Sequence, residues 1–304
     1  MPSKLLAVGM LAGFVGSAFA AGDTKTPPPN LAAAEIVNRN VAARGGLEAW
    51  RNVQAISESG QMGAGGDQRG PVAAPTVTPP GGPGKLQPLP SSARLAKEAQ
   101  LPFVLELARP RKVRLELQFA GKTAFQVYDG NNGWKVRPYL NRVDVEAFTA
   151  DELKEASMQA DLDGPLVDYQ AKGTRIDLDG TEKVDDRPTY KLKLTAKSGQ
   201  VLHVWIDAET FLETKIEGQP RRLDGKIHPV EIYYKDYRAV DGLQIPFLLV
   251  TKVLPSVNAG PTEVNMRVPP EQIVVDKVVV NPKLDPSRFS RPEIKAAATR
   301  HQGL

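Results

Sequence analysis

The stretch TRIDLDGTEKVDDRPTYKLKLTAKSGQVLHVWIDAETFLETKI, residues 174–216, decides the fold. From Tyr190 to Lys197 apolar and polar side chains alternate, which predicts a strand with one apolar face and one solvated face. Asp185–Asp186 predicts a turn before that strand, and Ser198–Gly199 and Ala208–Thr210 predict turns after it and after the next one. Four consecutive strands of an antiparallel meander are therefore expected, with an apolar face that must be buried against another part of the chain.

The same alternation recurs along most of the chain. It predicts further strands at Val53–Met62, Phe103–Leu107, Val113–Phe119, Thr123–Tyr128, Gly133–Pro138, Val230–Tyr237, Leu243–Leu254, Val264–Val268 and Ile273–Val280. Glycine and proline separate these strands at short, regular intervals, which is typical of a sandwich or barrel. Pro246 lies inside one predicted strand and indicates an edge or a bulge there.

Two parts of the chain change to a helical period. Leu31–Arg44 carries a narrow apolar stripe, with Asn30 as the expected N-cap, and predicts either a structural cover for the sheet or a mobile lid. Residues 149–158 start with a threonine followed three residues later by Glu152, the pattern of a capping box, and a second helical piece is expected at Leu166–Ala171. The two predicted helical pieces at 149–158 and 166–171 lie between two runs of strands, where they can cross the open side of a curved sheet. The sequence predicts an α+β fold that is mainly antiparallel β.

The first 20 residues have the pattern of a cleaved secretory signal peptide. A lysine precedes an apolar run, and Ala18–Ala20 supplies an A-x-A cleavage site, whereas the run is too short for a stable membrane span. We expect a single domain at 21–304 in an oxidising space such as a bacterial periplasm. The chain has no cysteine and a formal charge of +4, or +3 without the signal peptide's lysine, so packing alone must stabilise it and nucleic-acid binding has no support.

Two segments have a composition that does not favour a packed core. Residues 63–101 are rich in glycine, proline and alanine, and predict a flexible insertion between two strands. Docking of its Pro-rich part to a partner is an alternative. Residues 282–304 predict a polar tail, with a short helix possible at 293–298.

Residue patterns that would carry catalysis or hold a cofactor are weak. The three histidines lie far apart without metal-ligand spacing, and no G-x-S-x-G nucleophile motif is present, so we expect no catalytic residues, no metal and no cofactor. The acidic residues at 177–186 favour turns and a strand face over acid–base work, although a hydrolase acting through Asp179 and Glu182 stays open. The basic residues at 109–114 predict a solvated strand face, with phosphate binding as the alternative.

Five stretches resemble the outer-membrane lipoprotein-sorting proteins, relatives of the periplasmic lipoprotein carrier. They are EIVNRNVAARGGLEAW, NGWKVRPYL, TADELKEASMQADLDGPLVDY, GTEKVDDRPTYKLKLTAKSGQVLHVWIDAETFLETKIEG and YYKDYRAVDGLQIPFLLVTKV. The likeness runs from about Glu35 to Asn281. It implies an unclosed, half-open antiparallel barrel whose concave apolar face is covered by helices, and a carrier that shields acyl chains while they cross water.

Residues and resemblance together predict a non-enzymatic periplasmic carrier or binding protein for a lipidic or acylated ligand. The alternative is an envelope sensor or interaction module of the same fold that regulates a membrane partner. We expect a monomer that binds lipid or lipoprotein acyl chains, with a membrane-bound donor or acceptor protein as a further partner and no stable membrane insertion. The side chains expected to line the apolar concavity, from alternation, are Trp50, Leu115, Leu117, Phe125, Trp134, Leu192, Leu194, Trp205 and Ile232.

Overall fold

The structure is a computed structural model that describes residues 31–64, 99–138, 144–223, 225–256 and 268–293. The helices of this part of the chain are α1 (Ala33–Ala43), α2 (Leu47–Asn52), α3 (Ala150–Gln159) and the short 3-10 helix η2 (Pro286–Phe289). The strands are β1 (Ala55–Ala64), β2 (Ala99–Ala108), β3 (Lys112–Phe119), β4 (Lys122–Tyr128), β5 (Gly133–Val136), β6 (Glu146–Ala147), β7 (Arg175–Val184), β8 (Arg187–Thr195), β9 (Val201–Asp207), β10 (Glu213–Leu223), β11 (Lys226–Val240), β12 (Leu243–Val253) and β13 (Glu271–Val280). The predicted signal peptide, the predicted strand at 264–268 and the helix considered at 293–298 fall wholly or mostly outside the described residues.

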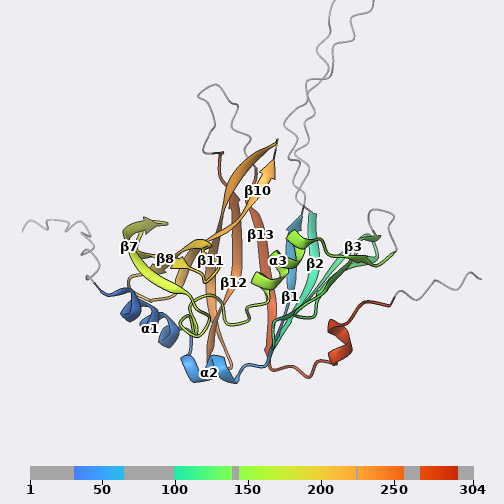
Figure 1. The fold of residues 1–304 in the computed structure, drawn as a ribbon, viewed down its shortest axis with the longest axis horizontal. Coiled ribbons are helices and arrows are strands. Elements are labelled where there is room, and N and C mark those ends of the chain that lie inside the picture. The colour runs from blue at the N-terminus through green and yellow to red at the C-terminus, as the bar shows by residue number, and fades with distance from the viewer. Residues whose placement is uncertain (1–30, 65–98, 139–143, 224, 257–267, 294–304) are drawn as a thin grey trace, which may run out of the picture.

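All of these strands belong to one antiparallel sheet. Its order is β6-β5-β4-β3-β2-β1-β13-β12-β11-β10-β9-β8-β7, so β6 and β7 are its two edges and the sheet is unclosed. Figure 1 shows the long strands β10 to β13 in the middle, with β7 and β8 to one side and β3 to the other. The predicted fold class, a mainly antiparallel half-open sheet with covering helices, is confirmed.

The predicted meander forms β7 to β10, which are neighbours in the sheet in chain order. Asp185 and Asp186 make the β7–β8 turn with φ values of 47° and 62°, a left-handed conformation that aspartate tolerates. Pro246 lies in β12 where that strand still pairs with β11 but no longer with β13, whose pairing with β12 spans Leu248–Thr251. Pro246 therefore lies in a stretch of β12 that is locally an edge, as predicted.

The sheet has one face on which the helices pack, here called the inner face, and an opposite outer face. Ile36, Val37 and Val41 of α1 and Trp50 of α2 are buried in one core cluster with inward residues of the sheet. α3 covers the β4–β5 side of the same face, where a smaller cluster forms around Tyr128 and Ala156. The main core is thus built on the inner face of the sheet.

The helix ends differ in part from the sequence prediction. The N-cap of α1 is Ala32, which makes no side-chain cap, whereas the predicted cap Asn30 lies outside the described residues. Gly45 and Gly46 end the helix with φ values of 117° and 96°, which a glycine adopts without strain. The capping box at the start of α3 is confirmed, because Thr149 accepts from the Glu152 backbone N–H and the Glu152 side chain accepts from the Thr149 N–H.

The predicted second helical piece at Leu166–Ala171 is wrong. Residues 160–174, here called the strap, run as successive turns from α3 to β7. Gly164 and Asp168 have φ values of 77° and 52°, which interrupt a right-handed helix. Leu166 and Val167 are each 0% exposed, so burial of two apolar side chains fixes the strap where helix hydrogen bonding does not.

The two predicted unstructured segments are partly ordered. β1 extends to Ala64 and β2 begins at Ala99, so both ends of the predicted insertion at 63–101 are strand, and 65–98 lie outside the described residues. The predicted polar tail contains η2, whose Phe289 is 3% exposed against the outer side of β3. Arg288 anchors the helix there by ion pairs of 2.7 Å to Glu106 and 3.0 Å to Glu116.

Candidate functional site

The inner face continues beyond the residues that the helices bury. Cross-strand pairs such as Leu105 with Leu115 and Ile273 with Met62 or Leu249 set one apolar side chain beside the next across neighbouring strands. The inner strip is defined here as the partly buried apolar residues Met62, Leu105, Leu115, Leu117, Ile216, Leu249, Ile273 and Val278. These residues come from six strands that span both halves of the sheet. They therefore form an extended apolar surface that is still partly exposed to solvent.

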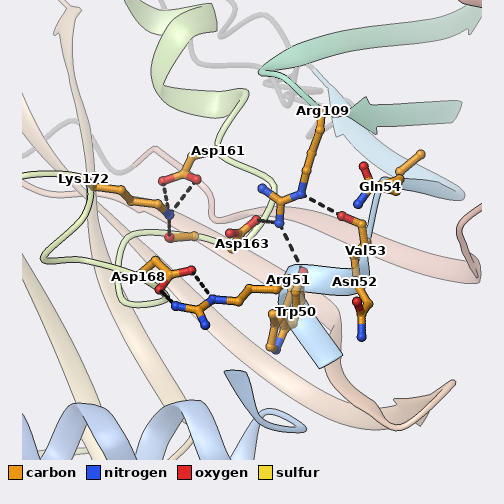
Figure 2. A network of polar contacts seen from close by, with 12 residues as sticks. Trp50, Arg51, Asn52, Val53, Gln54, Arg109, Asp161, Asp163, Asp168 and Lys172 are labelled. Carbon is orange, nitrogen blue, oxygen red and sulfur yellow. Dashed lines mark hydrogen bonds and ion pairs between the residues drawn. The ribbon is translucent and has the colours of Figure 1, made fainter. Parts of the chain in front are cut away.

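The strap crosses from one sheet edge to the other over this face, and a polar network holds it (Figure 2). Arg109, at the end of β2, donates to the Val53 carbonyl at 2.7 Å, to the Trp50 carbonyl at 3.1 Å and to the Asp163 carboxylate at 2.7 Å. The Asp163 side chain is 4% exposed, so its charge depends on this guanidinium. A single side chain thus ties β2, the end of α2 and the strap together.

Three more cations hold the strap. Arg44 donates to the Asp163 carbonyl at 2.9 Å and stacks over the Trp50 ring at 4.2 Å. Arg51 of α2 makes two hydrogen bonds with Asp168, at 2.7 and 3.0 Å, which lower the pKa of that carboxyl. The Lys172 ammonium donates to both oxygens of Asp161 at 2.8 Å and to the Gly164 carbonyl, within the strap itself. The strap is therefore joined to α2 and β2 by charge-assisted hydrogen bonds.

Of the nine predicted lining residues, five lie on the inner face of the sheet, and a sixth, Trp50 of α2, packs against that face. Trp50, Leu192 and Leu194 are buried in the core under the helices, whereas Leu115, Leu117 and Ile232 are partly exposed. Leu115 and Leu117 belong to the inner strip, and Ile232 is aligned with Ile216 of that strip.

The other three predicted lining residues lie on the outer face, so their expected inward orientation is wrong. Phe125 pairs with Glu116, and the Arg114 guanidinium stacks on its ring at 4.7 Å. Trp134 pairs with outward Val127. Trp205 donates its indole N–H to Glu182 and carries the Lys215 ammonium 3.8 Å above its ring. All three aromatic residues follow the polar phase of the alternation, and cations stack on the rings of Phe125 and Trp205 there.

One cavity of about 260 Å³ lies at the β7–β8 turn and beside β11, away from the inner strip. Charged side chains border it, including Asp185, Arg187, Asp207 and Lys235, and each has an ion-pair partner. None of the nine predicted lining residues borders this cavity.

The acidic and basic clusters singled out in the sequence do not gather into sites. Asp179 lies 3.2 Å from Lys191 and 3.4 Å from His203 on the outer face, and Glu182 accepts from Trp205, so both carboxylates have structural partners. In the basic stretch, Arg109 turns to the strap whereas Arg114 lies on the outer face with Glu116. No group of three or more histidine or acidic side chains suited to a metal occurs within the described residues.

The strap network is the feature that sequence reasoning missed. Asp163-Gly164-Pro165 is a turn signal in the sequence, and nothing in the local pattern shows that Asp163 meets Arg109, which lies 54 residues away. The available sequence signal was the series of acidic residues along the strap, Asp161, Asp163 and Asp168, together with the basic residues at 109–114. Opposite charges in two connecting segments would have indicated that the segments pair.

Comparison with known proteins gives a match in structure only. No family model and no curated protein matches the chain. A LolA superfamily protein from Nitrosomonas europaea covers 86% of this chain and 98% of its own at 10% identity and a TM-score of 0.49. An outer membrane lipoprotein-sorting protein domain from Vibrio parahaemolyticus (85% and 96% covered, 10% identity, TM-score 0.48) and a DUF1329 family protein from Desulfovibrio piger (87% and 98%, 12%, 0.49) match similarly.

The chain resembles the lipoprotein-sorting proteins, as its sequence predicts. At 10–12% identity the likeness concerns the fold, and the chemistry of the site has to come from the side chains of this chain. Within the described residues, the helices are too short or too polar to span a bilayer.

Proposed function

We propose that this protein is a periplasmic carrier or binding protein that shelters the acyl chains of a lipid or lipoprotein on the inner strip, beneath the strap and the helices. The observation that carries the proposal is the inner strip itself. It collects partly exposed apolar side chains from six strands on the face that the strap crosses. A protein that needed only a stable core would gain by burying these side chains completely.

The energetics of such binding are favourable without polar recognition. Removing about 12 methylene groups from water at ~0.8 kcal/mol each gives on the order of 10 kcal/mol. Part of this offsets the translational and conformational freedom that the ligand loses. The remainder is enough to hold a chain in water and still allow its release to a membrane, where the same methylenes are equally well accommodated.

The strap gives the proposed site a means of opening. Its contacts to α2 and β2 are hydrogen bonds and ion pairs, and those of Arg51 are exposed. The exposed pair of Arg51 contributes little stability and can exchange with water when a ligand enters, whereas the nearly buried Asp163 stays paired with Arg109. The buried Leu166 and Val167 keep the strap attached to the core during this movement.

Adjacent residues of β13 provide a matched test. Ile273 belongs to the inner strip, whereas Val274 is on the outer face and 38% exposed. We expect Ile273→Glu to weaken binding of a neutral fluorescent fatty-acid ester by about tenfold or more, because the new carboxylate would lie against the ligand's methylene groups. Val274→Glu should bind as the wild type does. Native mass spectrometry of protein purified from the periplasm should show lipid on the wild type and on Val274→Glu. Equal binding by both variants, or a wild type that takes up no ester, would contradict the proposal.

A further inference from the structure

Glu58 of β1 stands on the inner face among apolar residues. It is aligned with Leu105 on β2 and with Val278 on β13, both members of the inner strip. Ile56, two residues before it on the same face, belongs to the main core. The carboxyl group therefore projects from the floor of the apolar surface that the proposed function assigns to acyl chains.

This carboxyl has no hydrogen-bond or ion-pair partner within the described residues. Other acidic residues of the inner face are paired: Glu213 lies 3.4 Å from Arg44, and Glu271 accepts two hydrogen bonds of 2.7 Å from Arg221. The strands on either side of Glu58 present only apolar side chains to it, Phe103, Leu105 and Leu107 from β2 and Val275, Val278 and Val280 from β13. Among the elements that the structure describes, none supplies a charge to it.

The Glu58 carboxyl is largely desolvated, although its side chain is not fully enclosed. Burial alone raises the pKa of its carboxyl to about 7, yet the residue keeps an intermediate accessible surface. The two observations agree if the remaining exposure opens onto the inner strip instead of onto bulk water. A group that enters along the strip can therefore reach the carboxyl oxygens.

We propose that Glu58 binds the polar end of the ligand, and that this ligand is a long-chain amphiphile carrying an ammonium group. The inference rests on the proposed function, because it needs an acyl chain on the inner strip. An unpaired carboxylate in apolar surroundings is costly for the free protein, and a cation brought in by the ligand removes that cost. A carboxylate ligand meets a like charge at the same point and is disfavoured.

Three probes of equal chain length separate the polar contribution from the apolar one. Dodecylamine, dodecanol and dodecanoate compete at pH 8 with a neutral fluorescent dye for the purified, delipidated full chain. The wild type should bind dodecylamine about tenfold or more tightly than dodecanol, since a charge-assisted hydrogen bond is gained, and dodecanoate more weakly than dodecanol. Glu58→Gln, which keeps the size of the side chain, should bind the amine and the alcohol within about threefold of each other.

Binding of the alcohol reports whether the site is intact in each protein. Glu209→Gln, at an acidic side chain 81% exposed on the surface, is the matched control and should keep the preference for the amine. Equal affinity for amine and alcohol in the wild type would overturn the role of Glu58 while the carrier function stands. A preference for the amine that persists in Glu58→Gln would overturn it as well. Failure of all three probes to bind would overturn both proposals.

Discussion

At the scale of single residues, Arg109 holds more of the candidate site together than any sequence pattern suggests. Its three hydrogen-bond partners lie at the end of α2 and in the strap, and one of them is the nearly buried Asp163. We expect Arg109→Met to lower the free energy of unfolding by about 2 kcal/mol, less than the ~3–5 kcal/mol for breaking a fully buried pair, because Arg109 is 33% exposed. Urea unfolding measures this. Arg175→Met, at a side chain 72% exposed beside Asp177, is the control and should change stability by less than about 0.5 kcal/mol. Similar losses in both variants would contradict the role of Arg109.

Glu58 makes the stability of the free protein depend on pH. A carboxyl whose pKa rises from its ordinary 4.5 to about 7 on folding binds more protons in the folded state than in the unfolded state between these values. Stability therefore falls as the pH rises through that window, by up to about 3 kcal/mol above it. We expect delipidated Glu58→Gln to be more stable than the wild type at pH 8 and equal to it at pH 4. Urea unfolding at both pH values measures the difference, and a difference of the same size at both would exclude a titrating Glu58 as its cause.

The alternation of residues predicts which side chains share a face but not which face is the inner one. Leu115, Leu117 and Ile232 lie on the inner face because the apolar phase of their strands is continuous, and their contact with a ligand stays a prediction. Aromatic residues mislead this assignment, because Phe125 and Trp205 are apolar in composition yet lie in the polar phase with cations above their rings. Glu58 is the opposite case. It is a charged residue in the apolar phase, and its charge alone would predict a solvated position on the outer face.

At the scale of elements, η2 shows how a segment predicted to be polar tail becomes part of the fold. Phe289 is 3% exposed, and Arg288 meets two carboxylates of β2 and β3. We expect Phe289→Ala to lower the free energy of unfolding by about 3 kcal/mol, the usual cost of removing a buried aromatic ring. Phe119→Ala at the exposed end of β3, where the side chain is 46% exposed, should cost less than about 1 kcal/mol. Chemical denaturation compares the two, and a smaller loss for Phe289 than for Phe119 would show that η2 does not stabilise the sheet.

The strands and the capped helix α3 are predictable because their signals are local. The alternation of apolar and polar residues predicts the strands, and the capping box of Thr149 and Glu152 predicts where α3 begins. The strap is not predictable in this way. Its conformation depends on two buried side chains and on pairing with arginines distant in sequence, so a local apolar period at 166–171 is misread as helix.

At the scale of the whole molecule, an unclosed sheet needs protected edges. β6 is only two residues long, and β7 carries charged side chains such as Arg175 and Asp177 at the opposite edge. Short and charged edge strands disfavour pairing with a second chain. The connection of both edges through α3 and the strap then leaves the inner face as the surface where a ligand can be enclosed.

The location of bound acyl chains tests the central claim most directly. Stearate carrying a nitroxide spin label near its methyl end can be added to protein with labelled leucine and valine methyl groups. We predict that the label broadens the methyl signals of Leu105, Leu115, Leu117 and Leu249 on the inner strip, and leaves those of outward Val201, Val274 and Val279 sharp. Broadening confined to the outward valines, or none at all at saturating stearate, would contradict the claim that this protein binds acyl chains on the inner face of its sheet.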